Sequence, residues 1–206
     1  MTRKIPYGKQ SISAADVQAV VDVLSSDWLT QGPVIEQFEQ AIAKYCGAQH
    51  AVAVSNATAG LHIACMALGL GPGDRLWTSP NTFVASANCA LYCGAEVDFV
   101  DIDPDTLNMS VSALTTKLEA AEKSGTLPKV VVPVHFGGQS CDMRSIKQLA
   151  DQFGFFIIED ASHAIGGRYE EQPIGSCKTP SLTCRGTAIL PFTKAVFREL
   201  GNFKKN

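Results

Sequence analysis

The chain of 206 residues has no long apolar segment and little net charge. No window approaches the roughly 20 apolar residues that cross a bilayer, and the opening MTRKIPYGKQ lacks the apolar stretch of a signal peptide. The formal charge is −3, and no basic run of useful length precedes the last few residues, which argues against a nucleic-acid partner. These absences predict a cytoplasmic protein with no membrane and no nucleic acid among its partners.

The common nucleotide and metal motifs are also missing. The segment HAVAV is not followed by G-x-G-x-x-G, and the pattern G-x-x-x-x-G-K-[ST] does not occur, so a nicotinamide oxidoreductase remains only as an analogy of fold. The seven cysteines are an odd number and lie mostly within apolar periodic segments, which predicts reduced, buried thiols. Cys89 and Cys93 are spaced to share a helical face, but no His or further Cys lies close enough in sequence to complete a metal site.

What the chain does contain is a regular alternation of helical and strand-like segments, with 46% hydrophobic residues overall. Two helices are expected at the start, within residues 11–26 and 34–47. Strands are expected at 50–54, 75–80, 96–103, 129–136 and 155–160, and helices at 58–70, 83–94, 111–125 and 142–154. Strands that alternate with helices predict an α/β fold with a layered, mostly parallel sheet.

The last of these strands, FFIIED, is the most informative because its apolar run stops at an acid. Four successive apolar residues suit a strand that is buried on both faces, and ligands of open α/β sheets bind beyond the carboxyl ends of such strands. Asp160 and His163 would then stand at a ligand site. On this motif alone the alternative stays open, in which Asp160 only caps the next turn and His163 is satisfied by the backbone.

Three other strand ends carry features that suit the same ligand. SNATAG places Asn56 and Thr58 at a helix start, either as a phosphate-binding turn or as simple N-caps. Phe83 either stacks on a planar ring or belongs to the core. The turn HFGGQS, which starts at His135, allows either close backbone approach or a tight turn. Together with Asp160 they would suit pyridoxal 5′-phosphate, whose ring nitrogen stays protonated beside a carboxylate.

Five motifs in a fixed order resemble a known family. They are SNATAGLH, TSPNTFVASAN, DIDPDTLN, VPVHFGGQSCDM and EDASHAIGGRY, and the set is similar to the DegT/DnrJ/EryC1/StrS sugar-nucleotide aminotransferases over about residues 5–177. The resemblance implies the three-layer large domain of the fold type I pyridoxal-phosphate-dependent transferases, in incomplete form, with a pyridoxal 5′-phosphate cofactor and a homodimer. IPYGKQSI, DWLTQGPVIEQFE and SHAIG are most similar to the pseudaminic acid branch of the family. That branch transfers an amino group from glutamate to C4 of a UDP-linked 4-keto-6-deoxy-N-acetylhexosamine.

The resemblance also implies roles for individual residues. Asp160 would pair with the pyridinium nitrogen, His163 would lie near the ring hydroxyl, and Phe83 would stack on the ring. The phosphate would lie among Ala57, Thr58 and Ala59. The nucleotide-sugar site would be lined by Tyr7, Asp27, Trp28, Leu29 and Thr30, with Ala57 nearby. For Tyr7 and Trp28, ordinary surface or interface packing remains the alternative.

The segment after Cys177 departs from the family pattern. In the family, the lysine that forms the Schiff base follows the acid motif within a stretch that reads S-F-H-x-x-K. When the register set by His163 is continued without gaps, Ile189 stands where that lysine is expected, and Lys194 comes five residues too late. A dehydratase branch that uses His instead is disfavoured, because none of the four histidines lies near position 189.

Two functions are compatible with this pattern. Residues 1–177 are expected to form the N-terminal part of the large domain, and residues 178–206 a divergent tail outside the family fold, as in a truncated chain. The first function is a pyridoxal-phosphate-dependent aminotransferase of a UDP-sugar, which as written lacks its amine and is expected to be inactive. The second is a non-catalytic fragment that binds phosphate, the cofactor or a partner subunit.

Overall fold

The computed structural model describes residues 11–176 and the backbone of residues 186–190 and 194–197. The chain divides into two compact units, Met1–Phe38 and Glu39–Asn206, each of which is described by itself. The first unit contains α1 (Ala14–Leu24) and the start of α2 (Pro33–Cys46). Ser13 begins α1 with a capping box, because its hydroxyl accepts from the N–H of Asp16 while the Asp16 carboxylate accepts from the N–H of Ser13. Both predicted N-terminal helices are confirmed.

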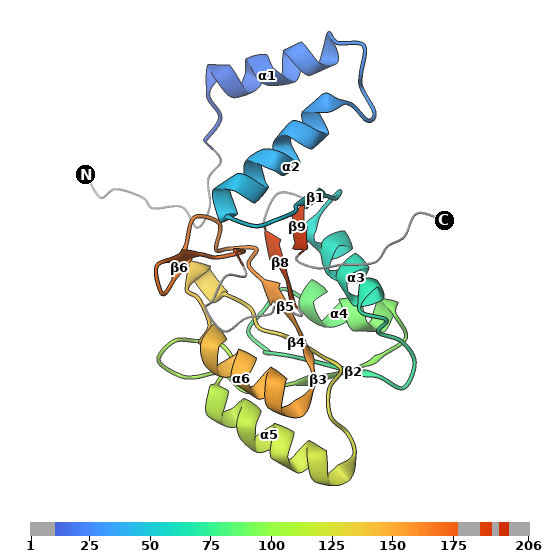
Figure 1. Ribbon diagram of the computed structural model, residues 1–206, viewed down its shortest axis with the longest axis vertical. Coiled ribbons are helices and arrows are strands. Elements are labelled where there is room, and N and C mark those ends of the chain that lie inside the picture. Colours follow the sequence, from blue (N-terminus) through green and yellow to red (C-terminus); the bar gives the residue numbers. More distant parts are fainter. Residues whose placement is uncertain (1–10, 177–185, 191–193, 198–206) are drawn as a thin grey trace, which may run out of the picture. The chain divides into compact units, whose positions relative to one another are not determined.

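The second unit is built on a sheet that has seven strands within the described ranges, in the order β1-β9-β8-β5-β4-β2-β3 (Figure 1). The strands are β1 (Val52–Ala53), β2 (Arg75–Thr78), β3 (Glu96–Phe99), β4 (Val130–Val132), β5 (Phe156–Asp160), β8 (Gly186–Leu190) and β9 (Lys194–Phe197). The five strands from β8 to β3 run parallel, whereas β9 is antiparallel to β8 and to β1. The predicted, mostly parallel sheet is confirmed.

Two strands come from the segment that the sequence set apart from the fold. The backbone of β8 pairs with β5, and β9 pairs with β8, so residues after Cys177 extend the sheet. The physical reason is that β5 would otherwise present an unpaired edge, and a short run such as GTAIL can satisfy its backbone groups. Of the strand predicted at 50–54, only Val52–Ala53 form a strand, β1, and β1 joins the sheet by pairing with β9.

Helices cover both faces of the sheet (Figure 1). On one face lie α3 (Ala57–Ala67) and α4 (Ala85–Tyr92), and on the other lie α5 (Val111–Ser124) and α6 (Met143–Phe153). Side chains alternate between two separate cores along each strand: Leu76, Val130, Val132 and Ile158 pack with α3 and α4, whereas Trp77, Val131 and Ile157 pack with α5 and α6. The result is a three-layer α/β arrangement.

This alternation decides where the acids at the end of β5 point. Phe156 and Ile158 belong to the α3–α4 side, so Asp160, two residues further on, faces that side as well. Glu159 faces the opposite side. A short 3₁₀ helix, Phe136–Gly138, follows β4, and a small hairpin of β6 (Arg168–Tyr169) and β7 (Gln172–Pro173) follows β5.

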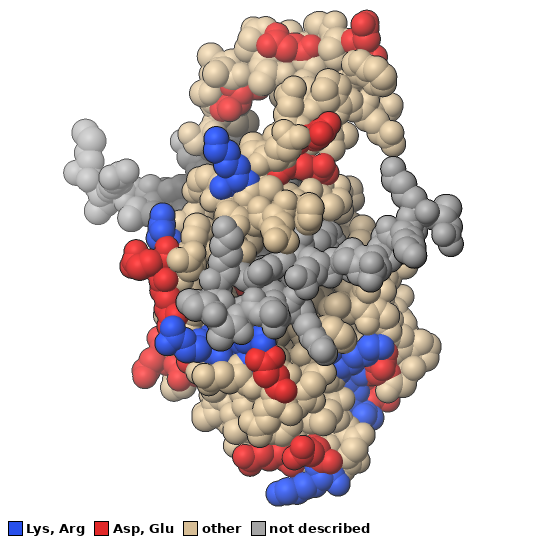
Figure 2. Space-filling view, viewed as in Figure 1, with Lys and Arg blue, Asp and Glu red and all other residues tan. Residues whose placement is uncertain are grey.

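The described cysteines are reduced, and the face shown in Figure 2 carries charges of both signs. Cys46, Cys65, Cys89, Cys93 and Cys141 are free thiols and mostly buried, as expected, whereas Cys177 and Cys184 lie outside the described residues. On the face that Figure 2 shows, Lys and Arg side chains lie beside Asp and Glu side chains. No helix in the described ranges combines the length and the hydropathy that a bilayer crossing requires.

Candidate functional site

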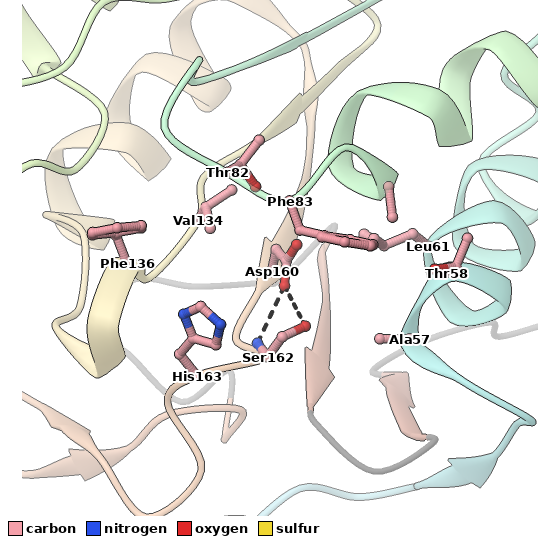
Figure 3. A pocket seen from close by; sticks show the side chains of 11 residues that line it. Ala57, Thr58, Leu61, Thr82, Phe83, Val134, Phe136, Asp160, Ser162 and His163 are labelled. Atoms are coloured by element: carbon pink, nitrogen blue, oxygen red, sulfur yellow. Dashed lines mark hydrogen bonds between the residues drawn. The ribbon is translucent and has the colours of Figure 1, made fainter. Parts of the chain in front are cut away.

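A pocket of about 240 Å³ opens at the carboxyl ends of β4 and β5, beside the N-termini of α3 and α4 (Figure 3). Five residues predicted from the sequence line it: Ala57, Thr58, Phe83, Asp160 and His163. Thr82, Val134, Phe136 and Ser162 are among the further lining residues. The position agrees with the rule that ligands of open α/β sheets bind at the carboxyl ends of the strands.

Asp160 is the buried acid of this pocket, with only 4% of its surface exposed. Its Oδ2 accepts a hydrogen bond of 2.6 Å from the hydroxyl of Ser86. Its Oδ1 accepts from the hydroxyl of Ser162 at 2.6 Å and from the Ser162 N–H at 3.2 Å. The contact with the N–H of Ser162 caps the following turn, so both readings of Asp160 hold: it caps the turn and it faces a pocket.

Backbone hydrogen bonds fix this strand end. The N–H of Asp160 donates to the carbonyl of Pro133 at 2.9 Å, and the Asp160 carbonyl accepts from the N–H of His135 at 3.0 Å. An isolated bridge pairs Val134 with Asp160 at the same place. The chain after β4 is therefore held in register with the end of β5, which keeps the carboxylate at a defined position beside Val134, another residue of the pocket wall.

The N-terminus of α3 supplies the second component. Asn56 is its N-cap, with Oδ1 accepting from the N–H of Ala59 at 2.8 Å, so of the two cap candidates Asn56 is confirmed. Thr58 lies within the first helical turn instead. The first intrahelical bond runs from Gly60 to the Asn56 carbonyl, and the N–H groups of Ala57 and Thr58 precede it. Both residues line the pocket, where such groups and the helix dipole favour an anion.

Three aromatic side chains, Phe83, Phe136 and His163, complete the walls. Phe83 is 71% exposed, which excludes the core alternative in this chain. Figure 3 shows its ring and the His163 imidazole in the space around Asp160. The rings of His163 and Phe136 meet edge to face, with their centroids 6.4 Å apart.

The glycine-rich turn after β4 makes a close backbone approach. Gly138 has φ +91°, and a Cβ there would lie 2.9 Å from the carbonyl oxygen of His163. Of the two readings of these glycines, close approach is therefore the one that applies at Gly138. The turn packs directly on the segment that carries His163.

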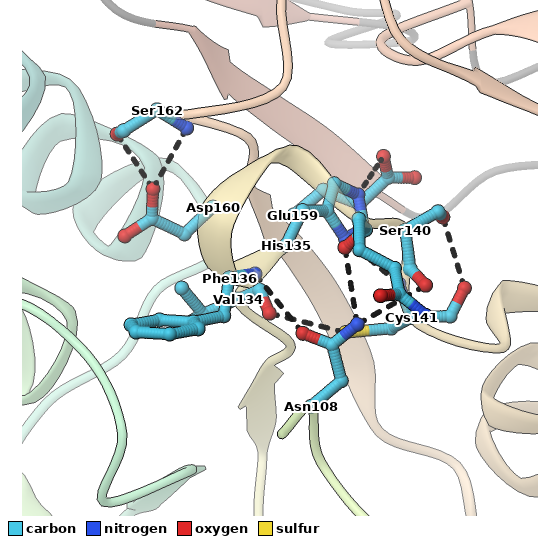
Figure 4. A network of polar contacts seen from close by, with 10 residues as sticks. Asn108, Val134, His135, Phe136, Ser140, Cys141, Glu159, Asp160 and Ser162 are labelled. Carbon is cyan, nitrogen blue, oxygen red and sulfur yellow. Dashed lines mark hydrogen bonds and ion pairs between the residues drawn. The ribbon is translucent and has the colours of Figure 1, made fainter. Parts of the chain in front are cut away.

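Asn108, which the sequence reasoning did not single out, holds this turn (Figure 4). Its Nδ2 donates to the carbonyls of Gln139 at 3.0 Å and of Ser140 at 3.1 Å, and its Oδ1 accepts from the N–H of Phe136 at 3.0 Å. The side chain is almost fully buried, with 2% exposed. The only signal in the sequence was its place at the end of DIDPDTLN, one of the family-like motifs.

His135 points away from the pocket, to the opposite face of the sheet. It is buried, with Nε2 3.4 Å from a carboxylate oxygen of Glu159 and Nδ1 accepting from the N–H of Cys141 at 3.2 Å (Figure 4). Burial lowers the pKa of His135, but the side chains of Cys141 and Glu159 outweigh it and raise the pKa to about 10. Protonation of Nδ1 would break the bond from the Cys141 N–H, so the two contacts of this ring favour different charge states.

Most of the other predicted residues belong to the first unit, to the segment after Cys177 or to positions outside the described ranges. Tyr7 is outside the described residues, and Asp27, Trp28, Leu29 and Thr30 belong to the first unit. Within that unit, Trp28 and Leu29 are exposed and line an apolar groove of about 290 Å³. The backbone register pairs Ile189 with Asp160, and Lys194 is in β9. Among the described residues no group of three or more His, Cys, Asp or Glu side chains is placed to hold a metal ion.

Comparisons with known proteins place this geometry in a family. The sequence profile described as the DegT/DnrJ/EryC1/StrS aminotransferase family matches residues 10–184. The spore coat polysaccharide biosynthesis protein SpsC of Bacillus subtilis strain 168 is 47% identical over 172 residues, which are 84% of this chain and 43% of SpsC. The chain thus spans less than half the length of this relative.

Two solved structures share the fold at lower identity. The PLP-form of the putative sugar aminotransferase Spr1654 from Streptococcus pneumoniae superposes with a TM-score of 0.78 at 26% identity, covering 97% of this chain and 54% of that one. Helicobacter pylori PseC, an aminotransferase involved in the biosynthesis of pseudoaminic acid, gives a TM-score of 0.75 at 28% identity, covering 84% of this chain and 45% of that one.

Proposed function

Because the chain belongs to the DegT/DnrJ/EryC1/StrS aminotransferase family, we propose that its pocket binds pyridoxal 5′-phosphate. Its three-layer α/β arrangement is that of the large domain of fold type I, in incomplete form, and the chain covers 54% and 45% of the two related structures. The observation that carries the proposal is the buried Asp160 carboxylate, which faces the same pocket as the N-terminus of α3 and the exposed Phe83.

The residues of the pocket fit this cofactor. A buried carboxylate needs a positive partner, and a pyridinium nitrogen provides one. The N–H groups of Ala57 and Thr58 suit a phosphate, with Ala59 held by the Asn56 cap. Phe83 is free to cover a ring face, and His163 is placed on the other side of Asp160 (Figure 3).

When bound, pyridoxal phosphate supplies an electron sink that allows an amino group to leave one carbon and join another. The chain's own residues bind and orient it. Asp160 would keep a proton on the ring nitrogen, because its carboxylate stabilises the positive charge there. His163 would donate to or accept from the ring hydroxyl, and Phe83 would exclude water from the ring face.

We propose that the amine for covalent attachment is absent from this site. The proposal is supported by the count along the sequence from His163, which puts the expected Schiff-base lysine at Ile189. In the sheet, Ile189 pairs with Asp160. We therefore propose that this chain holds the cofactor without a covalent bond, and that it does not transfer an amino group by itself. This favours the second function, a non-catalytic cofactor-binding or partner-binding protein, for the chain as written.

Borohydride reduction followed by peptide mapping tests this directly. Purified chain with stoichiometric pyridoxal phosphate should give no single fixed lysine, whereas Ile189→Lys should give one adduct at position 189. Leu190→Lys, one residue along the same strand, is the matched control. A wild-type chain that fixes one cofactor at a single lysine, such as Lys194, would refute the missing amine.

The substrate is proposed from the family branch. Tyr7 and the segment of Asp27, Trp28, Leu29 and Thr30 would bind a UDP-linked 4-keto-6-deoxy-N-acetylhexosamine, with glutamate as amino donor. The roles of SpsC in spore coat polysaccharide biosynthesis and of PseC in the biosynthesis of pseudoaminic acid support a sugar substrate. We include a cytoplasmic homodimer in the proposal, because the second unit exposes apolar side chains such as Ile63, Met66 and Leu91. Size-exclusion chromatography with light scattering tests the dimer, and a monomer at all concentrations would refute it.

A further inference from the structure

Asp160 is connected to a second hydroxyl through Ser86. Ser86 lies in the first turn of α4, is fully buried, and donates to the Asp160 carboxylate across 74 residues of sequence. The hydroxyl of Thr82, a residue of the pocket wall, lies 2.7 Å from the hydroxyl of Ser86. The three side chains therefore form a continuous polar chain from the pocket wall to the buried acid.

The direction of these hydrogen bonds follows from the number of protons. A hydroxyl has one proton, and an ionised carboxylate can only accept. The proton of Ser86 is used toward Asp160, so Thr82 must be the donor in the contact between the two hydroxyls. The chain runs from Thr82 to Ser86 to the carboxylate, and it leaves the lone pairs of Thr82 available to the pocket.

The Ser86 hydroxyl does not cap the helix in whose first turn it lies. Serine near a helix start commonly caps it, but within the described residues α4 has no side-chain cap hydrogen bond. The Ser86 hydroxyl is directed at Asp160 instead. Ser162 holds the other carboxylate oxygen, so the group is fixed from α4 on one side and from the following turn on the other. A carboxylate held at both oxygens cannot rotate, and charge-assisted hydrogen bonds of this kind are strong.

We propose that Thr82 and Ser86 form a hydroxyl relay that orients the Asp160 carboxylate toward the ring nitrogen of the bound cofactor. Ser86 is thus a positioning residue, which acts through Asp160. This inference rests on the proposed cofactor site. It predicts that loss of the relay weakens recognition of the ring nitrogen and leaves recognition of the phosphate and of the ring face intact.

Two probes separate these contributions in the full chain. Pyridoxamine 5′-phosphate needs no lysine for binding, and its 1-deaza analogue has the same shape without the ring nitrogen. The ratio of their affinities, measured by titration calorimetry, reports the contact with Asp160 alone. Ser86→Ala should reduce this ratio about tenfold, the loss expected for one charge-assisted hydrogen bond. Thr82→Val should reduce it about two- to threefold, because it removes the donor to Ser86.

Ser79→Ala is the matched control. It removes a buried hydroxyl that has no hydrogen-bond partner within the described part of the chain, so the ratio should stay at the wild-type value. Equal weakening of both probes by Ser86→Ala would identify a purely structural role and overturn the inference. If Ser86→Ala does not fold, Thr82→Val decides, and an unchanged ratio overturns the relay.

Asp160→Asn separates this inference from the proposed function. If it abolishes the preference for the ring nitrogen while Ser86→Ala and Thr82→Val leave that preference unchanged, the relay is refuted and the cofactor site stands. If the wild-type chain binds neither probe, or if Asp160→Asn has no effect on the ratio, the proposed cofactor site fails and the relay fails with it.

Discussion

Replacement of Asn108 by Ala should destabilise the second unit more than its small volume change suggests. The substitution removes three hydrogen bonds and leaves the carbonyls of Gln139 and Ser140 without this partner, whereas the N–H of Phe136 keeps its bond to the Val134 carbonyl. A buried polar group left unpaired costs about 1–3 kcal/mol, but Gln139 is at the surface, where water replaces part of the loss. We therefore expect a loss of about 3 kcal/mol in the free energy of unfolding.

Urea denaturation followed by circular dichroism measures this loss by linear extrapolation. Asn81→Ala is the matched control, because Asn81 makes one exposed hydrogen bond, to the Leu107 carbonyl, and its loss should cost about 0.5 kcal/mol or less. Affinity for pyridoxamine 5′-phosphate should also fall in Asn108→Ala, since Phe136 forms part of the pocket wall. A change in stability no larger than that of Asn81→Ala would refute the view that Asn108 holds the turn.

Three further predictions concern other parts of the second unit. The pKa of His135 is raised from 6.5 to about 10, so its contribution to stability is complete below pH 6.5 and is lost as the pH rises toward 10. The stability difference between wild type and His135→Gln should shrink over that range, and a flat difference would mean that Nδ1 stays unprotonated. Gly138→Ala should lower stability by about 2 kcal/mol, because the new Cβ would meet the His163 carbonyl in a left-handed conformation. Gly125→Ala, where nothing lies within 4 Å, should cost less in the same denaturation assay. Asn56→Ala should cost about 1 kcal/mol through loss of the N-cap, whereas Asn56→Ser should be close to wild type; equal losses would argue against capping.

The features predicted correctly from the sequence are those that leave a periodic signal. The apolar run before Asp160 identified a strand that is buried on both faces, and its acid identified the pocket. The N-cap at Asn56 and the exposed ring of Phe83 lie directly at strand-to-helix junctions, where the sequence places them without knowledge of distant contacts. Their convergence followed from the parallel sheet alone.

The features that were missed depend on contacts between distant segments. Asn108 bonds to carbonyls 31 and 32 residues away, and Ser86 in a helix resembles any other small residue until Asp160 is placed beside it. No role was predicted from the sequence for the His135 side chain, which lies on the far face because side chains alternate and Val134 occupies the pocket side. The contribution of β8 to the sheet was missed because GTAIL follows a stretch without any periodic pattern.

The register of β5 also determines which of two adjacent acids faces the pocket. Glu159 and Asp160 are adjacent and face opposite layers, the first toward His135 and the second toward Ser86. A slip of one residue in the pairing with β4 would exchange them and bring the longer carboxylate into the pocket. A single-residue insertion within Phe156–Asp160 should therefore abolish ligand binding, while the same insertion at Gly154, ahead of the strand, preserves the assignment. The identity of the functional acid is thus encoded in the pairing of strands as much as in the residue itself.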